Sequence, residues 1–144
     1  MKIVNKRATF DFEIENKFEA GIQLLGSEVK AVREGHADLT GSFMRIIGNE
    51  AYLVNSKIYP YKFARPEGYQ ETRTRKLLLH KKEILALKSK MDGAGLSCVP
   101  LSMYTTGDFI KVELALGKGK KQYQKKEAIK KRDIQRDIDR EIAS

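Results

Sequence analysis

Hydrophobic and polar residues alternate along much of the chain, which is the pattern of a β-strand with one buried face. In residues 9–15, Phe10, Phe12 and Ile14 alternate with acidic residues, giving an apolar face at a period of two. Gly48 starts a short polar turn between two such segments, which predicts a hairpin. The segments with strand signals are residues 9–15, 18–24, 43–47, 51–55, 96–104 and 108–116.

Two segments have helical spacing instead. Residues 28–33 follow Ser27, an expected N-cap, and precede Gly35, an expected stop, so they predict a helix of about two turns. A longer helical face is predicted further along the chain, closed by Gly95. Its members are Leu77, Leu78, Leu79, Ile84, Leu85, Leu87 and Met91.

About six or seven short strands with two inserted helices predict a mainly β fold. The helices interrupt the strands at irregular intervals, which argues against a parallel sheet and favours a small antiparallel barrel, closed or nearly closed, that protects its edges. Pro100 lies inside a predicted strand and is expected at an edge or a bulge, because proline donates no ladder hydrogen bond. Residues 62–74 predict a long loop. We expect a barrel domain over residues 1–118 and a tail over residues 119–144.

The tail has a different composition from the barrel. From Lys118 to Arg132 there are eight Lys or Arg residues and one acid, Glu127, and isoleucines recur every four residues from Ile134 to Ile142. A helix with so thin an apolar stripe is marginal alone in water. The tail is therefore predicted to be disordered when free and helical on a partner. A surface helix packed on the barrel through its isoleucines is the alternative.

The formal net charge of +9 is concentrated in two blocks. Residues 57–90 hold 10 basic and 3 acidic side chains, a net of +7, and residues 117–144 hold 10 and 5, a net of +5. The remaining segments are slightly acidic. Such blocks attract polyphosphate backbones, because each neutralised phosphate releases condensed counterions. The pattern favours nucleic acid as a partner over a cationic surface that has no dedicated partner.

The residues that carry most catalytic chemistry are scarce. Cys98 is the only cysteine, so no internal disulfide or multi-cysteine metal site can form, and it is expected to be a small core residue. His36 and His80 are the only histidines; His80 is expected to open a helix as a capping or surface residue. A ribonuclease using both as acid and base stays formally open. Residues 117–121 contain glycines and lysines but lack the Walker spacing. We expect no enzyme, no metal and no cofactor.

Nothing in the sequence resembles a targeting or membrane segment. The N-terminal residues contain no apolar run suited to a secretion signal, and no apolar stretch reaches the roughly 18 residues that a membrane-spanning helix needs. A single cysteine is compatible with a reducing compartment. The expected location is therefore the cytoplasm.

Four segments, in order, carry a resemblance to a known family: residues 5–8, 18–30, 72–81 and 112–121. The third includes TRTRKLLLH, which is specific by itself. Together they are similar to small protein B, the tmRNA-binding (SsrA-binding) family of bacterial trans-translation. The likeness runs from about Asn5 to Arg132.

The resemblance implies an oligonucleotide-binding-type (OB-like) barrel with a basic C-terminal tail. The family binds the tRNA-like domain of tmRNA, helps it enter a stalled ribosome, and places its tail in the empty mRNA path at the decoding centre, catalysing nothing. The implied partners are tmRNA and the ribosome, with no membrane and a monomer when free. The alternatives are a ribosomal or initiation-factor-like barrel that binds rRNA constitutively, and a nonspecific DNA-coating protein.

The resemblance also implies a tmRNA-contacting surface. Basic side chains there would hold phosphates, and Arg could stack on a base. Phe12 offers a stacking plane or packs in the core, Glu19 could accept a base amino group or position an arginine, and Leu78 makes contact or packs a helix face. The residues that map onto this surface are Asn5, Phe12, Glu19, Arg73, Arg75, Lys76 and Leu78.

In the tail, the resemblance implies contacts with the ribosome. Gln124-Lys125-Lys126 stands where the family commonly has Asp-Lys-Arg, so Lys126 is left as a point charge without the bidentate geometry of arginine. An aromatic ring at Tyr123 would stack on a ribosomal base. The expected ribosome-binding residues are Lys120, Lys121, Tyr123, Lys125, Lys126, Lys130, Lys131 and Arg132.

Overall fold

The computed structural model describes residues 2–60, 68–120 and 136. A seven-stranded antiparallel sheet dominates these residues, in the order β1-β8-β9-β2-β7-β5-β4. Its strands are β1 (Lys2–Val4), β2 (Phe12–Ile22), β4 (Phe43–Ile47), β5 (Glu50–Val54), β7 (Arg75–Leu78), β8 (Ser97–Thr106) and β9 (Phe109–Gly119). Strands β3 (Ala37–Asp38) and β6 (Lys57–Ile58) form a separate antiparallel pair.

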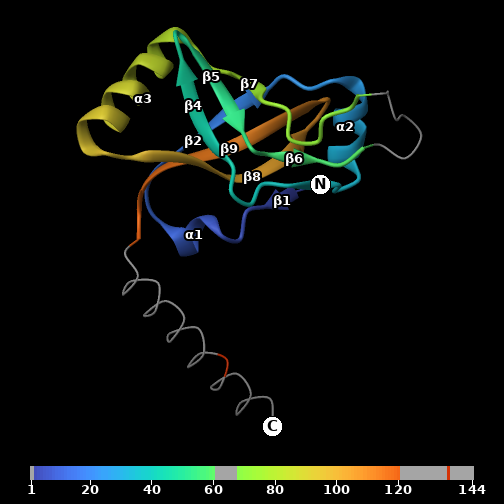
Figure 1. Cartoon of the computed structure of the whole chain (residues 1–144), viewed down its shortest axis with the longest axis horizontal. Helices are drawn as coiled ribbons and strands as arrows, with labels where there is room; N and C mark the ends of the chain where they lie inside the picture. Colours follow the sequence, from blue (N-terminus) through green and yellow to red (C-terminus); the bar gives the residue numbers. More distant parts are fainter. Residues whose placement is uncertain (1, 61–67, 121–135, 137–144) are drawn as a thin grey trace.

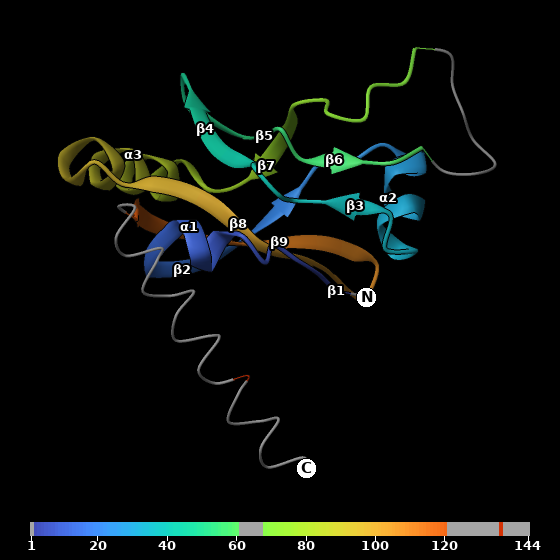
Figure 2. The same cartoon turned by 60° about the horizontal axis from the view of Figure 1, so that its bottom comes forward.

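The sheet curls into an open barrel. Figure 2 shows β4, β5 and β7 on one side and β8, β9 and β2 on the other. Edge strand β4 comes close to β8, but no ladder joins them in the described part of the chain, so the barrel is not closed there. The predicted mainly β, OB-like antiparallel fold is confirmed. The described residues contain nine strands rather than six or seven. The predicted segments 9–15 and 18–24 fall mostly in the single strand β2, β7 was expected within a helix, and β1 and β3 are too short for a period to show.

Helices α2 (Gly26–Arg33) and α3 (Lys81–Ala94) are the two predicted insertions and lie at opposite ends of the sheet (Figure 1). A third, short helix, α1 (Ala8–Asp11), was not expected, since Phe10 fits the alternating pattern of the following strand. The Arg7 carbonyl accepts hydrogen bonds from the N–H groups of Phe10 and Asp11, at 3.1 and 2.9 Å. The strand therefore begins at Phe12 rather than at residue 9.

The boundaries of the two predicted helices differ from expectation. Helix α2 is capped at Leu25 rather than Ser27, and the side chain of Glu28 accepts the Leu25 N–H at 2.8 Å. The residues Leu77 to Leu79 do not belong to the long helix: β7 occupies them up to Leu78, and α3 begins at Lys81. Three consecutive apolar residues fit a helix or a strand equally well by local pattern. They form a strand here because β7 pairs with β2 and β5.

Two apolar clusters lie on the two faces of the sheet. The larger one fills the barrel interior and includes Leu53, Met103 and Leu114. The smaller one lies under α1, where the partly buried Phe12 and Ile14 pack against it. Its buried members are Ala8, Val99, Leu101 and Ala115.

A bulge in β2 distributes the aromatic residues between these faces. The register against β9 shifts between Ile14 and Asn16. Phe12 and Phe18 therefore pack in different clusters although their spacing is even. A second register shift lies between Pro100 and Ser102 in β8, as predicted for this proline.

Substituting Gly117 by Ala is expected to lower the free energy of unfolding by about 1–3 kcal/mol, because overpacking forces backbone or side chains to shift. A Cβ at Gly117 would lie 2.8 Å from the backbone oxygen of Glu13 and 3.3 Å from Cβ of Phe12. Urea denaturation measures the change. Gly119→Ala is the control, since a Cβ at Gly119 meets no atom within 4 Å. Equal stability of the two variants would contradict the close approach of β2 and β9.

Candidate nucleic-acid interface

The outer face of the sheet carries a row of residues that five strands bring into register. Lys2 lies opposite Tyr104, Tyr104 opposite Lys111, Lys111 opposite Gly21, and Gly21 opposite Leu78. Directly paired residues project from the same face of an antiparallel sheet. We call Lys2, Tyr104, Lys111, Gly21 and Leu78 the outer row. Their chain neighbours Met103, Val112, Ala20 and Leu77 are buried on the inner face.

Glu19 joins this face and links its strands. It accepts a hydrogen bond from the Tyr104 hydroxyl, and its carboxylate pairs with Lys111 Nζ at 3.0 Å. The Tyr104 hydrogen bond and the Lys111 hydrogen bond hold the pKa of Glu19 below its ordinary value. In turn, the Glu19 carboxylate raises the pKa of Tyr104 to about 12. Glu19 therefore positions a lysine and a tyrosine, where the sequence suggested an arginine.

Leu78 is 54% exposed although it lies in a central part of the sheet. Gly21, its partner on β2, has no side chain to cover it, and a Cβ there would meet the Leu78 Cβ at 3.3 Å. Leu78 is thus an apolar residue on an accessible strand, and the helix-face packing considered for it does not occur. This geometry is compatible with the predicted RNA contact.

Arg73 and Arg75 form a cluster around Glu28, in which Glu28 and Arg75 are buried and Arg73 is partly exposed. Arg75 Nε donates to Glu28 Oε2 at 2.7 Å, and its other nitrogens donate to the carbonyls of Ser56 at 2.8 Å and Glu71 at 3.0 Å. Arg73 Nη2 donates to Glu28 Oε1 at 2.5 Å. Both Glu28 and Arg75 have completely buried side chains. We therefore assign Arg75 to the fold; its predicted tmRNA contact stays a prediction without geometric support.

The charge of Glu28 is maintained by this cluster. Burial by itself raises the pKa of Glu28, but hydrogen bonds from Arg73, from the Leu25 N–H and from Arg75 outweigh it. The net result is a pKa below the ordinary value. The carboxylate thereby joins the start of α2 to Arg73 and to Arg75 on β7, and Arg75 extends the link to the Glu71 carbonyl.

Asn5 and Phe12 also have roles inside the fold. Asn5 is 6% exposed, and its Nδ2 donates to the carbonyls of Leu39 at 3.2 Å and Pro100 at 2.9 Å. Phe12 is partly buried beside α1, where it packs against the smaller cluster. Both line a cavity of about 420 Å³ between α1, β4 and β8, which also includes Cys98. Their contacts with RNA remain predictions.

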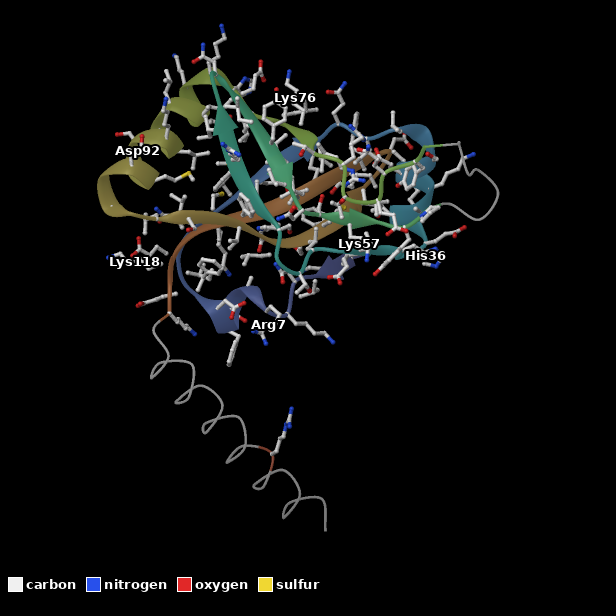
Figure 3. The ribbon with its side chains drawn as sticks, viewed as in Figure 1. Arg7, His36, Lys57, Lys76, Asp92 and Lys118 are labelled. Atoms are coloured by element: carbon white, nitrogen blue, oxygen red, sulfur yellow. The ribbon has the colours of Figure 1, made fainter. Side chains whose placement is uncertain are left out.

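Two other predicted site residues are partly exposed but paired. Lys76 on β7 forms an ion pair with Glu50 at 3.1 Å. Lys120 Nζ donates to the Thr9 carbonyl, and the Lys120 N–H donates to the Asp11 carbonyl, both at 2.8 Å. Lys120 is thus tied to α1 at the end of β9, whereas the expected tail begins at residue 119. Figure 3 shows Lys76 on the opposite side of the molecule from Arg7 and Lys118.

The remaining tail residues of the prediction lie outside the described residues. They are Lys121, Tyr123, Lys125, Lys126, Lys130, Lys131 and Arg132. The order or helicity of the tail and its contacts with the ribosome therefore stay predictions.

Among the described residues of the middle charge block, the most exposed cations lie on α3. Lys57, Arg73, Arg75 and Lys76 are all engaged with acidic side chains. In contrast, α3 exposes four lysines that have no ion-pair partner among the described residues. They are Lys81, Lys82, Lys88 and Lys90.

Sequence reasoning missed several residues of the outer face, namely Lys2, Tyr104, Phe109 and Lys111. For Lys111 the sequence carried part of the signal, because Lys111, like Glu113, occupies a polar position of an alternating strand. Alternation identifies a face only within one strand. Only the pairing register shows that the exposed faces of five strands coincide.

The catalytic alternatives gain no geometric support. His36 lies beside the end of α2, at the opposite end of the molecule from α3, whose N-cap is His80 (Figures 1 and 3). Cys98 is buried, and burial raises the pKa of its thiol to about 12, as suits a core residue. Within residues 2–60, 68–120 and 136, no three His, Cys, Asp or Glu residues are placed to hold a metal. No helix in these ranges is long and apolar enough to cross a membrane.

An open antiparallel barrel that presents cationic, aromatic and apolar side chains on one sheet face defines the class of small oligonucleotide-binding-type barrel proteins. Comparison with known proteins identifies the family within this class. The model of the family described as SmpB protein matches residues 2–144. The chain belongs to the SmpB family.

Relatives and a solved structure agree with this assignment. The SsrA-binding protein of Sulfurihydrogenibium sp. (strain YO3AOP1) is 52% identical over 136 residues, covering 94% of this chain and 90% of the relative. That of Chlorobium chlorochromatii (strain CaD3) is 51% identical over 138 residues, covering 95% and 88%. A chain of the solved structure "tmRNA-SmpB: a journey to the center of the bacterial ribosome" is 42% identical, with a TM-score of 0.71, and covers 89% of this chain and 94% of that one.

Proposed function

We propose that this protein is a tmRNA-binding adaptor that delivers tmRNA to stalled ribosomes for trans-translation in the cytoplasm. The observation that carries the proposal is its membership of the SmpB family, with relatives described as SsrA-binding proteins at about half identity over nearly the whole chain. The barrel would bind the tRNA-like domain, and the basic tail would contact the ribosome along the mRNA path. The protein would position RNA and carry out no reaction itself.

The outer face supplies the chemistry that such binding requires. Lys2 and Lys111 can hold phosphates, while Leu78 offers an apolar contact for a base or sugar. Glu19 keeps Lys111 oriented and leaves part of its own side chain exposed, so it can accept a hydrogen bond from a base amino group. Among the predicted contacts, Glu19 and Leu78 therefore have the best geometric support, followed by Lys76.

Binding of a tmRNA tRNA-like domain across a salt series tests the proposal. The full chain is compared with a version ending at Lys120, since that residue is anchored to α1. Ordinary tRNA and duplex DNA serve as competitors. Equal and selective binding by both versions is the expected result. If truncation abolishes binding, or if duplex DNA competes equally, the tail is a general polyanion anchor and the adaptor proposal fails. Stable cofractionation with vacant ribosomal subunits would instead favour constitutive rRNA binding.

Replacing Lys81, Lys82, Lys88 and Lys90 together by Ala is expected to weaken binding to RNA or to the ribosome and to make that binding less dependent on salt. Each lost phosphate contact should flatten the slope of log K against log salt by roughly 0.7–0.9. The thermal stability should change little, because all four side chains are exposed on α3. Titration of the variant with the tRNA-like domain and with ribosomes measures both slopes. Unchanged slopes with both ligands would show that α3 faces solvent in the complex.

A further inference from the structure

Phe109 is the most exposed of the large hydrophobic residues in the described part of the chain, at 70%. It opens β9 immediately after the turn that contains Gly107, whose φ of 58° lies in the left-handed region. Phe109 and Lys111 are two positions apart on β9 and therefore project from the same face of the sheet. The ring belongs to neither apolar cluster. The fold therefore does not use this aromatic side chain for packing.

A groove of about 310 Å³ lies beside Phe109. Its apolar lining comes from four parts of the fold, namely β2 with the segment that follows it, α2, β7 and the start of β9. Gly21 leaves this part of the outer row without a side chain, which keeps the space above Leu78 open. The residues that line the groove and matter here are Gly21, Leu24, Val29, Leu78, Phe109 and Lys111.

The groove is lined by one cation, Lys111, and one acid, Asp108, and a second cation, Arg33, lies near it. Lys111 Nζ is held by Glu19 at 3.0 Å. Arg33 at the end of α2 donates from Nη2 to the carbonyl of Asp108, the chain neighbour of Phe109, at 3.4 Å. An exposed ring with positive side chains nearby is an arrangement by which proteins bind single-stranded nucleic acid, with bases on the ring and phosphates on the cations.

We propose that this groove binds an unpaired nucleotide of the RNA, with its base stacked on Phe109 and against Leu78 and its phosphate near Lys111. The inference rests on the proposed function and extends it to a specific contact. The size of the groove favours a nucleotide over a protein partner, because a protein-docking patch would need a larger continuous apolar area than this groove offers. The groove is also continuous with Glu19 and Leu78, which are already expected to contact tmRNA.

Three substitutions of Phe109, assayed in the full chain with a tmRNA tRNA-like domain, test the stacking. Phe109→Ala should lose about 5- to 150-fold in affinity, the range expected for one stacked base. Phe109→Leu should lose nearly as much, because it keeps apolar area but has no aromatic face. Phe109→Trp should bind as well as the native chain. Tyr59→Ala is the matched control, because Tyr59 is also an exposed aromatic residue but does not line the groove.

The absence of tryptophan from the sequence makes Phe109→Trp a direct probe. Its fluorescence should be quenched and shielded from acrylamide when the RNA is added, whereas a Tyr59→Trp variant should change little.

Native binding by Phe109→Ala would overturn the inference while leaving the proposed function intact. So would unquenched indole fluorescence of the Phe109→Trp variant in a complex that forms normally. Failure of the native chain to select the tRNA-like domain would instead overturn the proposed function. Quenching by ribosomes but not by tmRNA would assign the groove to another partner and would equally reject this inference.

Discussion

Substituting Glu28 by Gln is expected to lower the free energy of unfolding by about 3–5 kcal/mol. The exchange preserves size but removes the carboxylate charge that compensates buried Arg75, and it weakens the contact with Arg73. Removing one partner of a buried ion pair leaves the other charge in a low-dielectric environment, which is far more costly than losing a surface pair. Urea denaturation followed by circular dichroism measures the loss. Glu50→Gln is the control, because it breaks the half-exposed pair with Lys76 and should cost at most about 1 kcal/mol.

The pH dependence gives a second measurement on the same group. The pKa of Glu28 is lower in the folded protein than in the unfolded chain, so its carboxylate stabilises the fold at pH values above its ordinary pKa of 4.5. That contribution is lost as the pH falls from there through the lowered folded pKa. The stability difference between the native chain and Glu28→Gln should therefore be largest near neutral pH and shrink in acid. A difference that is independent of pH would mean that packing, and not charge, is responsible.

Reversing the charge of Lys111 is expected to reduce the affinity for a tmRNA tRNA-like domain by about 10- to 100-fold at low salt. Lys111→Glu removes a central cation of the outer row and places a carboxylate beside Glu19. The loss should shrink as salt increases, because exposed charges are screened. Filter binding or fluorescence anisotropy at several salt concentrations measures the effect.

Lys118→Glu provides a charge-matched control on the same strand. Lys118 is exposed near the far end of β9, opposite Glu13, and lies on the side of α1 in Figure 3. Both variants change the net charge equally, so a general electrostatic attraction would weaken to the same extent in both. Equal losses would therefore reject the outer row as the RNA-binding surface. A loss confined to Lys111→Glu would support it. Thermal unfolding should show that both variants are folded, since neither side chain is buried.

Individual residues show how far the candidate site could be predicted. Leu78 and Glu19 were named from the resemblance, and both are accessible on the sheet. Arg75 was named in the same way but is buried, because its partner Glu28 lies 47 residues away and no local pattern shows that the two meet. Lys111 was assigned to the polar side of its strand but not to a site. Phe109 had no signal at all, since a single aromatic residue beside a turn fits a core position equally well.

The sequence by itself determined the elements whose information is local. Period-two alternation defined the strands from residue 96 to residue 116, and Gly35 and Gly95, both with positive φ, follow the ends of the two inserted helices. The ordered motifs also determined the family. Tertiary structure alone decided which faces are exposed, through the register of five strands and the bulges at Ile14–Asn16 and Pro100–Ser102. It did so because a shift of one residue exchanges the two faces of a strand, and that shift depends on partners distant in the sequence.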